Sequence, residues 1–231
     1  MINKWLKFNQ LLFSPHCILC EAVNGGDIGI CSDCHEDLPW HTEDQCPQCG
    51  LLALNNERCG QCIGMPPDFD AMHAVFRYEL PIDSMLQRYK YSEMLSMADT
   101  FAALMISAFR PNDPIDLLIP MPLHPQRLKE RGFNQSLEIA RILSRELSIP
   151  LNIEACQRIK LSPPQASLPY KERIKNMKGA FQCDANLSGK TVVLLDDVIT
   201  TGASLHALAK AVKSAGATHV ECWTIARTLA K

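Results

Sequence analysis

The sequence lacks any hydrophobic run long enough to cross a membrane. The chain has 231 residues, of which 47% are apolar, but apolar stretches such as the one that begins at Phe101 are short. A spanning helix needs roughly 20 predominantly apolar residues. The start carries Lys4 and Lys7 without the apolar core and small-residue cleavage site of a secretory signal. We therefore expect a cytoplasmic protein without membrane insertion.

Basic residues are scarce in the first seventy positions. This segment has three Lys or Arg against ten Asp or Glu, whereas the other 161 residues have twenty against fifteen. DNA affinity depends largely on cations that neutralise phosphates, so the acidic start argues against simple phosphate-backbone binding there. An anionic ligand fits the basic remainder better.

Cysteine, in contrast, is abundant and regularly spaced. Eight of the eleven cysteines form four C-x-x-C pairs, namely Cys17 and Cys20, Cys31 and Cys34, Cys46 and Cys49, and Cys59 and Cys62. One pair directs two thiolates at an ion, and a second pair about a hairpin away completes a tetrahedral site. Disulfides are a weaker explanation in a reducing cytoplasm. We expect two structural Zn²⁺ ions with sequential use of the pairs, and a cross-braced pairing stays open.

Other uses of these cysteines are less consistent with the sequence. The run Cys31–His35 has the C-x-x-C-H pattern of haem attachment, which requires export. Cys46–Cys49 could be a redox dithiol, but no βαβ pattern surrounds it. An iron–sulfur cluster stays open, because four cysteines serve both metals. We expect His35 and His41 to be solvated loop residues. Three isolated cysteines are expected to be small, buried or half-buried residues: Cys156, Cys183 and Cys222.

Strands alternate with helices after the junction Met65-Pro66-Pro67. The pattern predicts strands near 71–78, 115–119, 191–195 and 218–225, and helices near 81–91, 95–110, 134–148 and 203–215. Residues 150–190 are basic and are predicted to be irregular, with a short helix near 170–178. This order predicts an α/β fold with a mostly parallel sheet flanked by helices. We expect a zinc module at 1–65 and a second domain at 66–231, in which 66–110 form a helical hood and 111–231 the core.

Two acidic residues end an apolar strand and precede a glycine-containing loop. Asp196 and Asp197 follow Val192–Leu195, at the carboxyl end of a strand, where ligands bind in open α/β sheets. Hydroxyls, a glycine and the start of a helix come next and suit a phosphate monoester. An adjacent acid pair can hold a sugar diol, or a metal on the same sugar. Ordinary capping and turn residues are the alternative interpretation.

Two basic stretches accompany this loop. Arg127, Lys129 and Arg131 follow the strand near 115–119 and precede a helix start at Asn134, which suits a pyrophosphate group. His124, in the same stretch, is either a proton carrier or a plain loop residue. Five cations in 160–178, among them Arg173, stand against one acid and suit a lid that closes over an anion. The alternative for the first stretch is a solvated basic loop, and the alternative for 160–178 is a solvated amphipathic helix.

The run Val192–Ser204 resembles the signature with which type I phosphoribosyltransferases bind 5-phosphoribosyl-1-pyrophosphate (PRPP). The resemblance implies that Asp196 and Asp197, the best catalytic candidates, contact the ribose hydroxyls and that Mg²⁺ accompanies the pyrophosphate. It also implies a set of residues around the 5-phosphate: Thr200, Thr201, Gly202, Ala203 and Ser204. Purine enzymes have an Asp at the position of Thr200, and threonine cannot act as that acid or base. The run is more similar to orotate phosphoribosyltransferase, but the rest of the chain is not.

The order of all these motifs resembles the ComF family across essentially the whole chain. The motifs are the four cysteine pairs, the run Arg131–Gln135, the stretch Gln165–Phe181 and the PRPP-type signature. The resemblance implies a double zinc ribbon, a type I phosphoribosyltransferase-like domain and an association with DNA uptake.

Three functions stay open at this point. The first is transfer of a phosphoribosyl group to an unknown acceptor with release of pyrophosphate, for which no nucleophile, acid or base is identifiable. The second is a non-catalytic accessory protein that senses PRPP or a nucleotide and binds single-stranded DNA along 127–131 and 160–178. The third is a zinc module that docks DNA-uptake proteins through its acidic surface.

Overall fold

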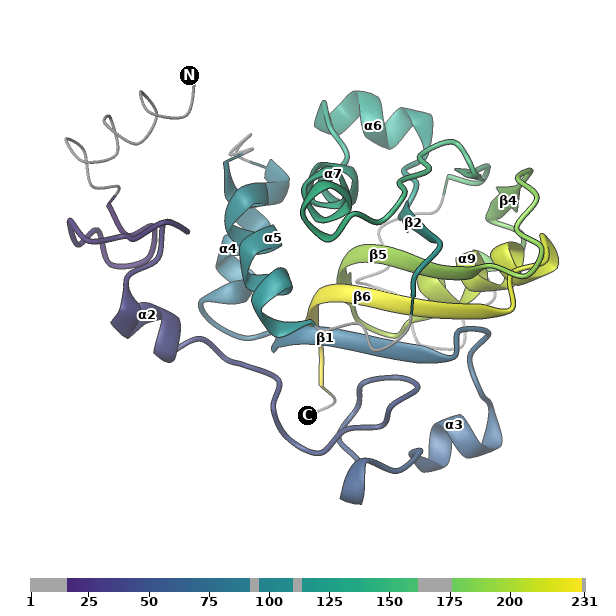
Figure 1. Cartoon of the computed structure of the whole chain (residues 1–231), viewed down its shortest axis with the longest axis horizontal. Coiled ribbons are helices and arrows are strands. Elements are labelled where there is room, and N and C mark those ends of the chain that lie inside the picture. Colours follow the sequence, from purple (N-terminus) through teal and green to yellow (C-terminus); the bar gives the residue numbers. More distant parts are fainter. Residues whose placement is uncertain (1–15, 92–95, 110–113, 162–175, 230–231) are drawn as a thin grey trace.

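A parallel sheet forms the centre of the molecule (Figure 1). A computed structural model describes residues 16–91, 96–109, 114–161 and 176–229. Four strands lie side by side with all neighbours parallel. Their order is β1 (Ala71–Arg77), β6 (His219–Arg227), β5 (Thr191–Ile199) and β2 (Leu117–Pro120). The expected α/β fold is therefore confirmed.

Helices cover both faces of this sheet. The apolar residues of α5 (Met97–Ala108) recur at helical spacing, so that Met97, Phe101 and Met105 are all buried against the sheet. The same face is covered by α4 (Ile82–Tyr91) and α7 (Gln135–Leu147). The opposite face is covered by α9 (Ala203–Ser214). The central strand β5 is apolar without alternation over Val192–Leu195 because both of its faces are buried.

Two expected boundaries differ from the structure. The strand expected at 191–195 continues to Ile199, so Asp196 and Asp197 lie within β5, held by pairing with the equally long β6. The basic stretch expected as a loop contains a helix, α6 (Pro125–Arg131). Its boundaries have a physical cause, since His124 caps the start, Pro125 occupies the first turn and Gly132 ends it at a φ of 80°.

Residues 150–190 are also more regular than expected. An antiparallel hairpin of β3 (Cys156–Arg158) and β4 (Phe181–Cys183) packs near α9. Cys156 and Cys183, isolated in the sequence, are cross-strand partners in it. The segment between the strands that includes 162–175, and with it Arg173, lies outside the described residues.

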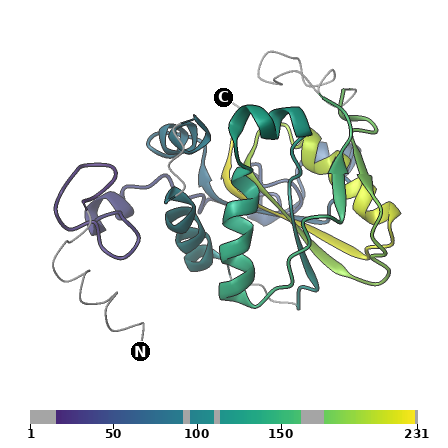
Figure 2. The same cartoon turned by 90° about the horizontal axis from the view of Figure 1, so that it is seen from above.

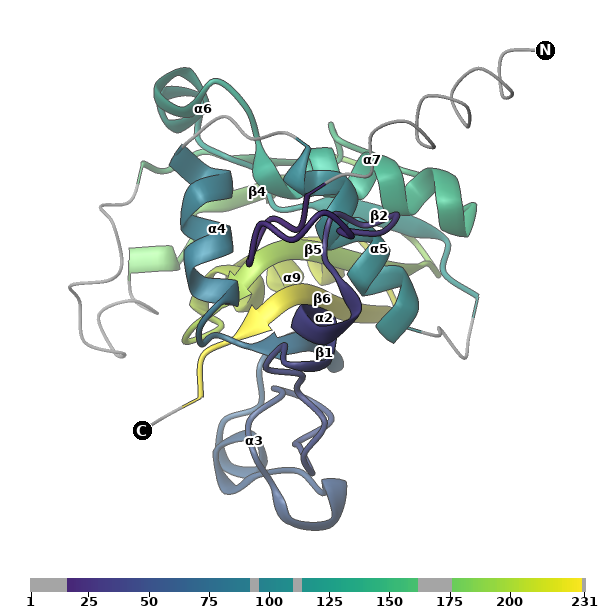
Figure 3. The same cartoon turned by 90° about the vertical axis from the view of Figure 1, so that its left-hand side faces the viewer.

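The cysteine-rich segment has little regular structure and forms two separate lobes. It contains only short helices in its described part: α2 (Ser32–Glu36), the 3₁₀ helix η1 (Leu54–Asn56) and α3 (Gly60–Gly64). The lobe with α2 packs beside α4 and α5, away from the sheet (Figure 2). The lobe with α3 projects from the β1 edge (Figure 3). His41 was expected to be solvated, but it is buried there and hydrogen-bonds through Nε2 to the Gly50 carbonyl at 2.8 Å.

No helix among the described residues has the length and apolar character needed to span a bilayer.

Candidate functional site

The eight paired cysteines form two clusters, each the right size for one ion. The ligand sulfurs within each cluster all lie within 4.8 Å of one another. We call Cys17, Cys20, Cys31 and Cys34 the first cysteine cluster, and Cys46, Cys49, Cys59 and Cys62 the second cysteine cluster. The sequential pairing is thus confirmed. Four sulfurs around one point fit a closed structural Zn²⁺ site with no open position for catalysis.

Backbone N–H groups favour the thiolate, the form that binds metal, at one sulfur of each cluster. Neighbouring sulfurs raise the pKa of Cys34, and burial followed by neighbouring sulfurs raises that of Cys62. Burial raises the pKa of the Cys17 thiol, but backbone N–H groups, that of Cys31 first, outweigh it and lower the pKa to about 6. The Cys31 N–H lies 3.4 Å from the Cys17 sulfur. In the second cysteine cluster, N–H groups of the chain near Cys59 and Cys49 likewise overcome burial and lower the pKa of Cys46 to about 7.

A second site lies at the carboxyl end of β5, where the chain turns into α9. We call residues 200–204 the phosphate loop. Its Gly202 has a φ of 77°, and a Cβ there would come within 3.3 Å of the Ile199 side chain. Gly202 also occupies the N-cap of α9, which has no side-chain cap. The Ala203 N–H donates to the Thr201 hydroxyl at 3.4 Å. The start of α9 lines a small hollow together with the loop and Asp196, an arrangement that suits an anion.

The two acids beside this loop have different environments. Asp197 is 9% exposed and its carboxylate forms an ion pair with Lys90 of α4, at 2.7 Å. Asp196 accepts hydrogen bonds from the Asp197 N–H at 2.9 Å and from the Ser136 hydroxyl at 3.3 Å. Burial, and then the neighbouring Asp197 charge, raise the pKa of Asp196 to about 7. The pair thus combines one carboxylate that is bonded to Lys90 with one carboxyl whose pKa is raised to about 7.

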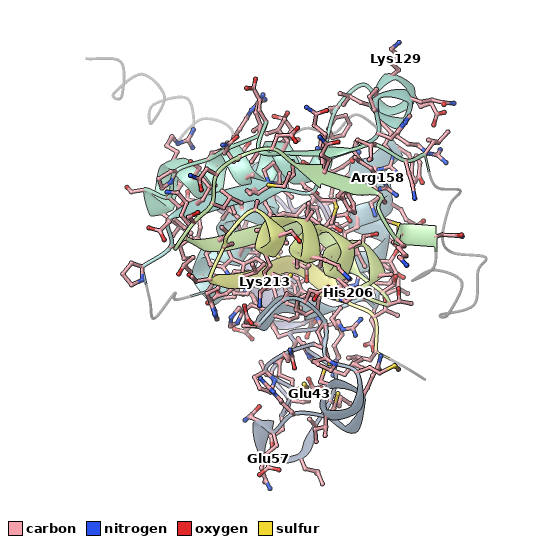
Figure 4. The ribbon with its side chains drawn as sticks, turned by 90° about the vertical axis from the view of Figure 1, so that its right-hand side faces the viewer. Glu43, Glu57, Lys129, Arg158, His206 and Lys213 are labelled. Atoms are coloured by element: carbon pink, nitrogen blue, oxygen red, sulfur yellow. The ribbon has the colours of Figure 1, made fainter. Side chains whose placement is uncertain are left out.

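Cations face these acids across a cavity of about 310 Å³. Three arginines line it and are called here the arginine group: Arg127, Arg131 and Arg158. Lys90, Asp196, Asp197 and Ser204 line the same cavity, so it is continuous with the phosphate loop. The expected residues Arg127 and Arg131 come from α6. Arg158 comes from β3, and Figure 4 shows it below the α6 residue Lys129.

Two buried polar groups in this cavity have no partner within the described chain. They are the Gln135 side-chain amide nitrogen and the Nε of Arg158. Gln135 is 2% exposed, and Arg158 lies over the Phe181 ring at 5.6 Å. Burial lowers the pKa of Arg158, which Asp196 partly offsets. Buried polar atoms without partners are costly and rare. Both residues also line the cavity, where the arginine group offers N–H donors to an anionic ligand.

Sequence reasoning missed Lys90 and Arg158, and it placed Gln135 and Ser136 in the pyrophosphate stretch without giving either a role of its own. Lys90 lies far from Asp197 in the chain, and only the packing of α4 on the sheet brings it near. Arg158 lies on a strand of three residues, too short for an alternating pattern. A signal did exist for Ser136: Asn134 caps α7 by accepting from the Ser136 and Leu137 N–H groups, which fixes that helix start beside Asp196.

Two domain families match the chain in the expected order. Residues 8–63 match the double zinc ribbon domain. Residues 134–231 match the phosphoribosyl transferase domain.

Curated relatives match almost the whole chain. The DNA utilization protein YhgH of Shigella flexneri is 32% identical over 221 residues, which cover 92% of this chain and 97% of that protein. Competence protein F of Haemophilus influenzae is 30% identical over 226 residues, with 93% and 98% covered. Competence protein ComFC of Bacillus subtilis is 26% identical over 234 residues, with 92% and 95% covered. The chain therefore belongs to the ComF family of competence-associated proteins, in which a double zinc ribbon precedes a type I phosphoribosyltransferase-like domain.

Proposed function

We propose that this protein binds PRPP together with Mg²⁺ in the cavity that joins the phosphate loop to the arginine group. The observation that carries the proposal is the order of groups along two adjoining hollows, which share Asp196 and Ser204 in their lining. An uncapped helix start lies at one end, an acid pair in the middle and three arginines at the other end. PRPP has the matching order of a phosphate, a ribose diol and a pyrophosphate.

Each part of the site then has one task. The phosphate loop would bind the 5-phosphate through the first N–H groups of α9 and through the hydroxyls of Thr200, Thr201 and Ser204. Asp196 and Asp197 would accept from the ribose hydroxyls. Arg127, Arg131 and Arg158 would neutralise the pyrophosphate.

The residues present also fit Mg²⁺, which prefers carboxylate and phosphate oxygens. Asp196 offers a carboxylate that has no cation bonded to it among the described residues, whereas Asp197 is already paired with Lys90. The ion would add positive charge where the pyrophosphate and this carboxylate meet. Asp196 would then be ionised in the complex although its pKa is about 7 in the free protein.

Transfer of the phosphoribosyl group is the reaction that such a site supports. Breaking the bond from ribose C1 to pyrophosphate leaves positive charge on the sugar, and the acid pair lies where it would stabilise that charge. The arginine group would hold the negative leaving group. No residue among those that the structure describes at the cavity takes the role of acceptor, so an external nucleophile would supply the new bond to C1.

A non-catalytic role in DNA uptake or DNA metabolism is the second candidate. The names of the relatives, competence protein and DNA utilization protein, support it. Thr200 supports it too, because its hydroxyl cannot exchange a proton with a purine base as a carboxyl would. In this role PRPP or a nucleotide would regulate an accessory protein that handles single-stranded DNA.

Binding is tested by titrating PRPP and Mg²⁺ into the protein and into the variant Gly202→Ala. We expect the variant to bind roughly 5- to 30-fold more weakly, because alanine at positive φ costs about 1–2 kcal/mol and its Cβ meets Ile199. Gly189→Ala is the matched control, since Gly189 has a φ of 74° and open space around its Cβ position. Equal affinity of both variants would contradict the assignment of the loop.

Catalysis is tested separately by measuring pyrophosphate released from PRPP with a panel of base and amine acceptors. Acceptor-dependent release that is lost in Asp197→Asn would support the transferase. Tight binding without release for any acceptor would favour the accessory role.

A further inference from the structure

Arg227, the last residue of β6, is a buried cation between the phosphate loop and the second cysteine cluster. It is 4% exposed. Its Nε donates to the carbonyl of Cys49 at 3.0 Å. Its Nη1 donates to the carbonyl of Ile199 at 3.2 Å and to that of Thr200. One guanidinium therefore joins a metal-ligand residue to the first residues of the phosphate loop.

The charge of Arg227 has no carboxylate partner among the described residues, where its side chain bonds only to carbonyl oxygens. A buried charge is costly unless an opposite charge compensates it. The second cysteine cluster offers that charge, because four thiolates around one divalent ion leave a surplus of negative charge. Arg227 is thus placed as a counter-ion of the metal centre as well as a support of the loop.

The space between the loop and the second cysteine cluster is not filled by packing. A mostly apolar cavity of about 200 Å³ separates them and is lined by Cys49 and Cys62 on one side and by Thr201 and Gly202 on the other. Side chains across a gap transmit little force, since van der Waals contact is lost there. Arg227 lines the same cavity, and its directional hydrogen bonds connect the two sides that packing does not join.

The second cysteine cluster is also fixed to the sheet by its own backbone. The Met72 N–H of β1 donates to the Pro47 carbonyl at 3.0 Å, and the Gln48 side chain donates to the Phe69 carbonyl at 3.2 Å. The first cysteine cluster has different neighbours. Its segment is bonded to α5, where Thr100 donates to the Ile28 carbonyl at 2.8 Å. Only the second cysteine cluster is thus connected by described hydrogen bonds to the end of β6 below the loop.

We propose that Arg227 is a positioning residue that couples the second metal centre to the phosphate loop. Metal held by Cys46, Cys49, Cys59 and Cys62 would keep the loop in its binding shape, whereas metal at the first cysteine cluster would not affect it. The two zinc ions of this protein then have different roles. The affinity part of this inference rests on the proposed PRPP site, but the shape of the loop can be measured without ligand.

The test compares loop exchange in variants of the full chain, measured as hydrogen exchange of the two amides that donate to carbonyls at the loop. These are the N–H of His206, which donates to the Gly202 carbonyl at 2.8 Å, and the N–H of Thr228, which donates to the Ile199 carbonyl at 2.9 Å. In Arg227→Gln we expect two bound zinc ions, an unchanged melting temperature within a few degrees, and loop exchange at least roughly tenfold faster. Cys62→Ser should lose one ion and show the same faster exchange. Cys34→Ser should lose one ion and keep the wild-type rate.

Arg77→Gln is the matched control for charge removal. Arg77 pairs with Arg227 in the register of β1 and β6 and forms an ion pair with Glu43 near the second cysteine cluster, but it does not touch the loop. We expect wild-type exchange in this variant. Wild-type loop exchange in Arg227→Gln would overturn the proposal, even if Cys62→Ser failed to fold.

Ligand affinity gives the second measurement. PRPP affinity should fall at least roughly tenfold in Arg227→Gln and remain unchanged in Cys34→Ser. If the wild-type protein did not bind PRPP, the proposed function would fail and the exchange result would still decide the coupling. If the wild type bound PRPP and Arg227→Gln bound it equally well, the coupling would be refuted.

Discussion

At the residue scale, Asp196 and Asp197 are neighbours that differ in how the fold accommodates a negative charge. The Asp197 carboxylate is compensated by Lys90, whereas burial and the Asp197 charge make ionisation of Asp196 unfavourable. The pKa of Asp196 is raised from 3.8 to about 7, so the folded state binds a proton that the unfolded state has released in this range. Stability contributed by this carboxyl is therefore complete below about pH 4 and is lost as pH rises to about 7.

We predict that Asp196→Asn gains stability relative to wild type as pH rises from 4 to 8, by at least about 1 kcal/mol. Asparagine keeps the shape of the side chain and cannot ionise. Urea unfolding at both pH values measures the difference. A constant difference between variant and wild type would show that Asp196 does not titrate near neutrality. The same variant should lose Mg²⁺-dependent PRPP binding, so stability and function conflict at this position.

At the scale of elements, the hairpin of β3 and β4 brings the cation that the sequence did not reveal. Arg158 is held in the cavity with an unpartnered Nε and no carboxylate bonded to it among the described residues. Arg158 is half-buried, and a partly desolvated cation without an opposite charge is unfavourable, so an apolar side chain in its place removes that cost.

We predict that Arg158→Met weakens PRPP binding roughly tenfold or more and leaves the melting temperature unchanged or higher. Calorimetric titration and thermal unfolding measure the two effects. Lys129→Met, on the exposed side of α6, is the control and should change neither. A large drop in melting temperature for Arg158→Met would mean that the arginine holds the hairpin together instead of facing a ligand.

The same elements explain how far the sequence could predict the structure. The long helix α5 was predictable because Met97, Phe101 and Met105 repeat an apolar residue once per helical turn. The buried strand was predictable because Val192–Leu195 is an uninterrupted apolar run. The helix α6 was missed although a proline and a glycine mark its ends. The phosphate loop was predictable because all its residues are consecutive. Contacts such as Lys90 to Asp197 were not, because tertiary packing alone creates them.

At the scale of the whole molecule, acidic side chains on the lobe of the second cysteine cluster lie apart from the arginine group. Figure 4 shows Glu43 and Glu57 on the lobe of the second cysteine cluster and Lys129 and Arg158 at the opposite end of the molecule. An acidic lobe and a basic cavity on one chain would keep anions away from the metal and direct them to the site.

We predict two zinc ions per chain, because each cluster has four sulfurs within 4.8 Å and no fifth ligand is needed. Native mass spectrometry and elemental analysis measure the number and the element. Cys20→Ser should bind one ion, and Cys156→Ser, which changes a cysteine outside both clusters, should bind two. Iron in place of zinc, or one ion in the unchanged protein, would contradict the assignment.

The most direct measurement of the central claim is a crystal structure of the protein with Mg²⁺ and PRPP. We expect the 5-phosphate within hydrogen-bond distance of the N–H groups of the phosphate loop, the ribose hydroxyls at Asp196 and Asp197, and the pyrophosphate between Arg127, Arg131 and Arg158. PRPP bound elsewhere, or a cavity that remains empty at ligand concentrations that saturate other PRPP-binding proteins, would contradict it.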